Sequence, residues 1–162
     1  MKIRKATIND LDDILKIYEY ARSFMANNDN PTQWGDGYPK KELLISDIEK
    51  GQLYVFDTGN ELVGVFAFII GEDPTYKVIE NGSWNYDEAY GTIHRIATNG
   101  KAKGLSKLCF DYCIDKIPYL RIDTHHDNKP MQQAVKKYGF KECGIIYVAD
   151  GSPRIAYDYH KA

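Results

Sequence analysis

Apolar residues recur along this chain with two different periods, and each period predicts one type of element. A period near 3.6 residues indicates four helices, at residues 9–26, 39–51, 104–117 and 128–139. Short runs rich in β-branched and aromatic residues indicate seven strands, at residues 2–7, 52–57, 62–70, 90–98, 120–125, 143–148 and 154–160. The order β-α-α-β-β-β-α-β-α-β-β predicts a three-layer α/β fold with a mixed sheet.

Capping residues and turns place the ends of these elements. Asn9 is the expected N-cap of the first helix, because its side chain can accept from unpaired N–H groups of the first turn. Asp127 or Asn128 caps the fourth helix in the same way, and Gly139 ends it. Residues 52–70 and 143–160 each hold two strand-like runs around a turn, so both predict antiparallel hairpins.

The composition narrows the class of protein. At 162 residues, a single domain covering residues 1–162 is the simplest organisation. The formal net charge of −2, with scattered lysines and arginines, offers no basic patch, so we expect no nucleic-acid partner. The longest apolar run, residues 62–70, is too short to cross a bilayer, and the first residues resemble a strand more than a signal peptide. We therefore expect no membrane association and a cytoplasmic location.

Residues 99–106 join a predicted strand to the third helix and contain two glycines and two lysines. The first N–H groups of a helix lack intrahelical acceptors and lie at the positive end of its dipole, an arrangement that binds phosphate. Gly104 would let a ligand approach the backbone, and Lys101 and Lys103 add positive charge. Turn geometry alone also explains Gly100 and Gly104. A P-loop is excluded, because Gly104 is not followed by lysine.

Two motifs in this chain resemble those of the GCN5-related N-acetyltransferase (GNAT) family. Residues 93–98 (IHRIAT) with residues 101–106 (KAKGLS) resemble the acetyl-CoA motif, whose pattern is Arg/Gln-x-x-Gly-x-Gly/Ala. Residues 128–140 (NKPMQQAVKKYGF) are similar to the later motif, Asn-x-x-Ala with a terminal Gly-Phe. Lys101 stands where Arg or Gln is usual, Ser106 stands where Gly or Ala is usual, and the loop before Lys101 is about two residues short.

The resemblance covers essentially the whole chain and implies a GNAT-like fold with a mostly antiparallel central sheet and about four flanking helices. It implies an N-acetyltransferase with acetyl-CoA as co-substrate. The backbone of residues 101–106 would receive the pyrophosphate of CoA, and residues 96–98 would hydrogen-bond the pantetheine arm, with Asn128 on its other side. The residues implied to bind acetyl-CoA are Ile96, Ala97, Thr98, Lys101, Ala102, Lys103, Gly104, Leu105, Ser106 and Asn128.

Acetyl transfer to an amine needs a base, because an alkyl ammonium has a pKa near 10. His94 is the leading candidate: histidine has an ordinary pKa near 6.5, and this strand would lead to the thioester. A purely structural role for His94 is the alternative. Alternation along residues 120–125 places Arg121, Asp123 and His125 on one face, which makes Asp123 and His125 secondary candidates. By the resemblance, a backbone N–H of Ile96 or Ala97 would stabilise the oxyanion.

No metal is expected at His125-His126-Asp127, because adjacent side chains on an extended segment point in opposite directions and no Cys or Glu ligand is nearby. Many family members carry a tyrosine, as general acid, seven residues after the motif asparagine, where this chain has Val135. Tyr138, three residues further, is expected to pack in the core or to contact CoA.

The acceptor pocket is expected to be formed by two variable loops, residues 30–38 and 73–90, which offer Trp34, Tyr38, Trp84 and Tyr86 as apolar walls. Asp36, Glu80, Asp87 and Glu88 are candidate partners for a cationic amine, and each is equally well explained as a solvated charge. A small-molecule amine is the predicted acceptor. A protein N-terminal or lysine acetyltransferase and a non-catalytic acyl-CoA binding module are the alternatives. The oligomeric state is open, with a homodimer as one alternative.

Overall fold

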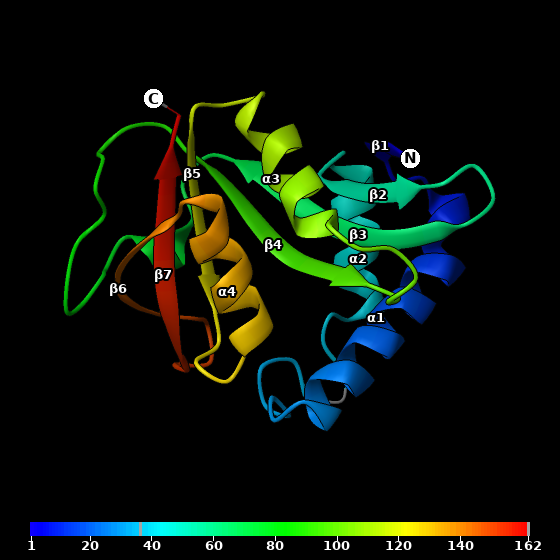
Figure 1. Ribbon diagram of the computed structural model, residues 1–162, viewed down its shortest axis with the longest axis horizontal. Helices are drawn as coiled ribbons and strands as arrows, with labels where there is room; N and C mark the ends of the chain where they lie inside the picture. Colours follow the sequence, from blue (N-terminus) through cyan, green and yellow to red (C-terminus); the bar gives the residue numbers. More distant parts are fainter. Residues whose placement is uncertain (36, 162) are drawn as a thin grey trace. The chain divides into compact units, whose positions relative to one another are not determined.

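The computed structural model describes residues 1–35 and 37–161, and its elements follow the predicted order (Figure 1). The strands are β1 (Lys2–Lys5), β2 (Leu53–Asp57), β3 (Leu62–Ile70), β4 (Gly91–Thr98), β5 (Tyr119–Thr124), β6 (Lys141–Tyr147) and β7 (Pro153–His160). The α-helices are α1 (Leu11–Asn27), α2 (Lys41–Glu49), α3 (Leu105–Ile114) and α4 (Lys129–Tyr138), with 3₁₀ turns at η1 (Ile8–Asp10) and η2 (Pro74–Tyr76).

The strands form one seven-stranded sheet in the order β1-β2-β3-β4-β5-β7-β6. β4 pairs with β5 in parallel, whereas the β1–β2, β2–β3, β5–β7 and β6–β7 pairs are antiparallel. The predicted α/β fold with a mixed, mostly antiparallel sheet is confirmed, and so are both predicted hairpins. Within the described residues, no helix is both long enough and apolar enough to cross a membrane.

The chain divides into two compact units, and β3, β4 and α3 each contribute residues to both. The first unit comprises Met1–Phe68 and His94–Cys109, and the second comprises Ile69–Ile93 and Phe110–Ala162. The core of the first unit gathers the apolar stripe of α1 with side chains of α2, β2, β3 and β4. Its members include Ile14, Ile17, Tyr18, Leu44, Leu53, Val55, Val65 and Ala97. Burying an aliphatic side chain of this size contributes about 1.5–3 kcal/mol.

The second unit has a core rich in tyrosine, in which the segment between β3 and β4 packs against β5, β6 and β7. Its buried members are Tyr76, Tyr90, Tyr119, Cys143, Ile146 and Ala156, with Trp84 packed against them. Tyr76 comes from residues 73–89, in which the sequence predicted no helix or strand. That loop is therefore part of the core.

Several predicted boundaries differ from those of the structure, and three of them affect the reading of the site. Asn9 does not cap α1, because a 3₁₀ turn precedes the helix and the Asp10 carboxylate instead accepts from the Thr7 N–H at 2.8 Å. Arg4 holds that carboxylate through an ion pair of 2.8 Å. The strand predicted at residues 120–125 ends at Thr124, so His125 lies beyond it. α2 begins at Lys41 and not at residue 39.

Candidate active site

Hydrogen bonds between side chains and backbone shape the turn that connects β4 to α3 in the first unit. The Thr98 hydroxyl oxygen accepts from the Gly100 N–H at 3.3 Å, and Asn99 Oδ1 accepts from the Lys101 N–H at 3.1 Å. Asn99 Nδ2 donates to the carbonyl of Leu62 at 3.2 Å, which fastens the turn to β3. Gly100 has a φ of 78°, a left-handed conformation that favours glycine. Turn geometry therefore accounts for Gly100.

The start of α3 presents backbone donors to an open space. The first helical bond runs from the Leu108 N–H to the Gly104 carbonyl at 3.2 Å, so the N–H groups of Leu105 and Ser106 have no intrahelical acceptor. Gly104 has a φ of 74°, and a Cβ built there would meet no atom within 4 Å. An anion can approach this part of the backbone closely, and the helix dipole favours it there.

The Lys101 side chain forms an ion pair with Glu61 and is not a free cation at the start of α3. Its ammonium pairs with the Glu61 carboxylate at 2.8 Å, and its N–H donates to Asn99. Both side chains of the ion pair are about half exposed, so the pair contributes roughly 0.2–1 kcal/mol. Of its neighbours, Ala102 is half-buried and Lys103 is exposed. An anion at the start of α3 would therefore meet backbone N–H groups, because Glu61 already engages the Lys101 ammonium.

Arg95 interrupts β4 with a left-handed backbone. Its φ is 55°, which is uncommon for a residue with a Cβ, and the Tyr18 hydroxyl donates to its carbonyl at 2.7 Å. The simple alternation of side chains predicted for a strand therefore breaks at this residue. The predicted site residues on β4 lie around it: His94, Ile96 and Thr98 are half-buried, and Ala97 is buried.

A buried ion pair joins Arg95 to Asp47 of α2. The distance between Arg95 Nη2 and Asp47 Oδ2 is 2.6 Å, and the two side chains are only 10% and 6% exposed. Arg95 Nη1 also donates to the Tyr38 hydroxyl at 3.4 Å, and Trp34 lies between the rings of Tyr38 and Tyr18 at 6.3 and 5.6 Å. The predicted acceptor residues Trp34 and Tyr38 are thus brought together, and Tyr38 contacts Arg95, which the sequence did not identify as a site residue.

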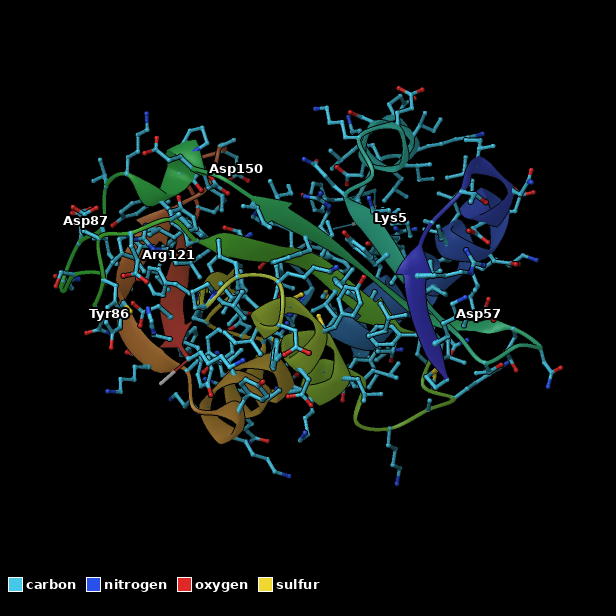
Figure 2. All side chains as sticks on the ribbon, turned by 90° about the horizontal axis from the view of Figure 1, so that it is seen from above. Lys5, Asp57, Tyr86, Asp87, Arg121 and Asp150 are labelled. Atoms are coloured by element: carbon cyan, nitrogen blue, oxygen red, sulfur yellow. The ribbon has the colours of Figure 1, made fainter. Side chains whose placement is uncertain are left out.

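In the second unit, Arg121 of β5 is buried, and Figure 2 labels it together with Tyr86 of the preceding loop. Its guanidinium carbon lies 4.3 Å from the ring centroid of Trp84 and 4.1 Å from that of Tyr90. It donates to the Tyr119 hydroxyl at 3.2 Å and to the carbonyl of Tyr86 at 2.9 Å. Trp84 therefore packs on an internal cation, whereas the Tyr86 side chain remains 44% exposed.

The carboxylate of Asp158 holds the loop between β3 and β4, which carries Trp84 and Tyr86. Asp158 of β7, itself buried, accepts from the Tyr119 hydroxyl at 2.7 Å and from the N–H and Nδ2 of Asn85 at 2.8 Å each. Burial, followed by the bond to Asp158, raises the pKa of Tyr119, so its hydroxyl remains a donor. The loop is also paired with β6, since Glu80 and Ile145 exchange backbone bonds of 2.9 and 2.8 Å. It is a fixed wall.

The acidic residues predicted near the acceptor have different surroundings. Glu88 bonds to His160 at the end of β7, and the exposed residues Glu80 and Asp87 lie on the same loop. Asp36 lies outside the described residues. His160 Nδ1 bonds to the carbonyl of Lys161 at 2.8 Å, so both ring nitrogens face oxygen atoms. These bonds, first to Lys161 and then to Glu88, raise the pKa of His160.

This raised pKa predicts that the contact between His160 and Glu88 stabilises the protein more at low pH. A group whose pKa is raised by folding contributes fully below its ordinary value, here near 6.5, and the contribution is lost as the pH rises through the folded-state pKa. We expect Glu88→Gln to lower the Tm at pH 6 and to leave it unchanged at pH 9. Thermal unfolding of both proteins across this range tests the prediction.

The matched control for Glu88→Gln is Asp87→Asn, which removes an adjacent exposed carboxylate. Its Tm difference from the natural chain should not follow the titration of His160. A Tm difference for Glu88→Gln that grows with rising pH would contradict the assigned direction.

The two secondary candidates for proton transfer are both engaged with the protein. Asp123 accepts from the Tyr76 hydroxyl at 2.6 Å, and burial together with this carboxylate raises the pKa of Tyr76 well above its usual range. His125 is buried, and its Nδ1 accepts from the Asp127 N–H at 3.0 Å. Burial, and then the charge of Arg154, lowers the pKa of His125, so the neutral imidazole is favoured.

The side chains of His125, His126 and Asp127 do not diverge as predicted. Their potential ligand atoms lie within 4.8 Å of one another, and the two imidazoles stack with centroids 4.2 Å apart. The prediction of opposite directions was wrong because these residues lie in a turn after β5. The bond from the Asp127 N–H to His125 Nδ1 and the nearby charge of Arg154 both oppose a cation at this place.

The position of the usual general acid is filled by a buried apolar side chain. Val135 of α4 is fully buried, and Asn128 Oδ1 caps the same helix by accepting from the Met131 N–H at 3.2 Å. The Tyr138 hydroxyl donates to Asp111 at 2.7 Å, and its ring packs edge-on against Phe110. Burial, and then Asp111, raises the pKa of Tyr138. Tyr138 is thus half-buried and packs against α3.

Solved structures resemble the chain over nearly its whole length. A GNAT-family acetyltransferase from Streptococcus agalactiae 2603 is 33% identical, with a TM-score of 0.90 and coverage of 99% of this chain and 95% of that chain. A putative acetyltransferase from Staphylococcus aureus Mu50 is 26% identical, with a TM-score of 0.73 and 99% coverage of both chains. A putative acetyltransferase from Salmonella typhimurium, solved with its cofactor acetyl-CoA, shares the fold at 15% identity, a TM-score of 0.65 and coverage of 99% and 94%.

No protein-family model and no curated protein matches the chain. The structural matches nevertheless define its fold as that of an acetyltransferase. The match to the Streptococcus agalactiae structure covers nearly all of both chains at 33% identity, and it shows the family as well. The chain belongs to the GNAT family of acetyltransferases, which confirms the resemblance predicted from its motifs.

Proposed function

We propose that this chain transfers the acetyl group of acetyl-CoA to the primary amine of a small molecule, by direct transfer in a ternary complex. The observation that carries the proposal is the open helix start at residues 104–106, in a chain that belongs to the GNAT family. Direct transfer requires that both reactants be held together, which converts a bimolecular reaction into an effectively unimolecular one.

The N–H groups of Leu105 and Ser106 would bind the pyrophosphate of CoA, beside the uncrowded backbone of Gly104. Lys101, Ala102 and Lys103 belong to the same predicted loop, and the contact between Lys101 and Glu61 would open if Lys101 moved to the phosphate. The backbone of residues 96–98 would hydrogen-bond the pantetheine arm. Asn128 would contact that arm while its Oδ1 caps α4.

His94 would remove the proton from the acceptor amine, and the N–H of Ile96 or Ala97 would stabilise the oxyanion formed at the thioester carbonyl. Asp123 and His125 are weaker candidates for the base, because Tyr76 and the Asp127 N–H already occupy them. With Val135 in place of tyrosine, water or another tyrosine would protonate the leaving thiolate. Each of these roles follows from the family and the position of the residue.

A small acceptor is supported by the way the aromatic residues are held. Trp34 and Tyr38 pack together, with Tyr38 beside Arg95, and the loop carrying Trp84 and Tyr86 is fastened to Arg121 of β5. Such compact apolar walls suit a small molecule better than a polypeptide, which needs an open groove. In the first unit, Trp34 and Tyr38 are the proposed walls for the acceptor. In the second unit, the exposed Tyr86 is a candidate wall residue, and Trp84, which packs on Arg121, is a weaker one.

We expect acetyl-CoA to stabilise the protein against thermal unfolding, and adenosine alone to have little effect. A ligand at 100 times its dissociation constant adds about 2.7 kcal/mol, and only acetyl-CoA carries the pyrophosphate that the helix start would hold. Thermal shift measurements with both compounds check this prediction. Absence of stabilisation by acetyl-CoA would rule out the proposed function.

Release of CoA in the presence of a panel of amines and peptides then separates the alternatives. Turnover with small amines supports the proposal, and turnover with peptides alone would favour a protein N-terminal or lysine acetyltransferase. Binding of acetyl-CoA without any turnover would instead indicate a non-catalytic module, for which the buried Val135 is the main argument.

A further inference from the structure

We propose that Asp47 is a positioning residue for acetyl transfer. Through its ion pair with Arg95, it holds the backbone of β4 in the conformation that orients the Ile96 N–H and the adjacent His94. The inference rests on the proposed function, because it assigns a purpose to a contact beside the proposed oxyanion donor. Asp47 lies on α2 and belongs to no motif of the family quoted above.

The backbone of Arg95 needs support from its surroundings. A residue other than glycine in the left-handed region is strained, and it persists only where neighbouring groups hold it. Two groups from different helices do so here. The Tyr18 hydroxyl of α1 donates to the Arg95 carbonyl at 2.7 Å, and the Asp47 carboxylate of α2 accepts from the guanidinium at 2.6 Å.

The groups that make these two contacts are largely shielded from water. Tyr18 is fully buried, and this burial raises its pKa far above the ordinary value, so the hydroxyl stays a donor. The side chains of Asp47 and Arg95 are 6% and 10% exposed, and removal of one partner would leave the other charge buried. Arg95 Nε is itself buried without a hydrogen-bond partner among the described residues, which makes Asp47 the dominant anchor of the guanidinium.

The peptide between Arg95 and Ile96 links these contacts to the proposed oxyanion donor. The Arg95 carbonyl and the Ile96 N–H belong to one planar trans peptide, in which they point in opposite directions. When Tyr18 fixes the carbonyl, it also fixes the direction of the Ile96 N–H, which would stabilise the oxyanion. His94 precedes the same left-handed residue, so its direction relative to that N–H depends on the dihedral angles of Arg95.

The decisive experiment separates the backbone conformation of residue 95 from its charge. Asp47→Asn keeps the size of the side chain and removes its charge, and we expect a fall in kcat of about 10-fold for the best acceptor amine, with KM for acetyl-CoA unchanged. Adding Arg95→Gly to Asp47→Asn should restore kcat to within about threefold, because glycine adopts this φ without strain. Adding Arg95→Ala instead should give no recovery.

A second measurement does not depend on turnover. The amide resonance of Ile96, followed by NMR in the protein without ligand, should shift in Asp47→Asn and return in the Asp47→Asn/Arg95→Gly double variant. Glu49→Gln, which changes an exposed acid on the same helix, is the matched control and should leave both readouts unchanged. If no amine is acetylated by the natural chain, the proposed function fails, and the amide resonance still decides the positioning role.

The proposal is overturned if Asp47→Asn leaves the Ile96 resonance unchanged. It is also overturned if the glycine and alanine double variants behave alike, since the left-handed backbone would then be irrelevant. A loss of stability alone cannot produce the expected pattern. Glycine at position 95 has an advantage over alanine only because it adopts the left-handed φ without strain.

Discussion

The variant His94→Ala is expected to lower kcat/KM for acetyl transfer by about 100-fold or more at neutral pH, because a positioned general base typically contributes 10²–10⁴-fold. His94 follows the last β4 residues that pair with β5 and directly precedes the left-handed Arg95. In this position it is adjacent to the backbone that would bind the thioester. The measurement is the pH dependence of kcat/KM for the natural chain and the variant, with one amine.

Two controls make the His94 prediction specific. His126→Ala removes an exposed imidazole and should leave kcat/KM unchanged. An acceptor amine of low pKa, already neutral at pH 7, should lose far less rate from His94→Ala than an alkylamine, because it does not need the base. An unchanged pH profile with the alkylamine would show that His94 is not the base.

His125 is the natural rival to His94, and its surroundings argue against it. Its Nδ1 lone pair accepts from the Asp127 N–H, so proton transfer would have to use Nε2, which carries the hydrogen in that tautomer. Its side chain is also buried beside Arg154, whose charge disfavours a protonated imidazole. A base must accept a proton during the reaction, and this site opposes that step.

The sequence predicted the fold well where local signals agree with the tertiary structure. α4 is the clearest case: Asn128 caps it, Gly139 ends it with a φ of 118°, and Val135 faces the core. The prediction failed where a distant partner decides the local structure. Arg4 draws Asp10 into an ion pair and moves the start of α1, which no pattern around Asn9 reveals.

The candidate site divides in the same way. The turn glycines and the start of α3 lie within one short motif, and they were predicted. The support of Arg95 comes from Tyr18 and Asp47, which are 77 and 48 residues away in the sequence, so their contacts could not be predicted from spacing. Likewise, Trp84 was predicted as a pocket wall, but its ring packs against the guanidinium of Arg121 on β5, a contact that the sequence does not reveal.

Replacing Asp158 by alanine is expected to lower the free energy of unfolding by about 3–5 kcal/mol. The carboxylate is 2% exposed and accepts three hydrogen bonds, one from Tyr119 and two from Asn85. Its removal leaves the buried Tyr119 hydroxyl without its acceptor, at a cost of about 1–3 kcal/mol, and it also removes the two charge-assisted bonds from the exposed Asn85, which contribute less because water can replace them. For a chain of this length, such a loss lowers the Tm by on the order of 10 °C.

Denaturant unfolding of two further variants identifies the cause of this loss. Asp158→Asn keeps one acceptor oxygen, so it should lose only about half as much stability. Some loss remains, because the new amide NH2 places a donor against the donors of Asn85. Asp115→Ala removes an exposed carboxylate and should change stability by less than about 0.5 kcal/mol. A loss below about 1 kcal/mol for Asp158→Ala would mean that the loop carrying Asn85 and Tyr86 is held by Arg121 and its aromatic neighbours, and not by this carboxylate.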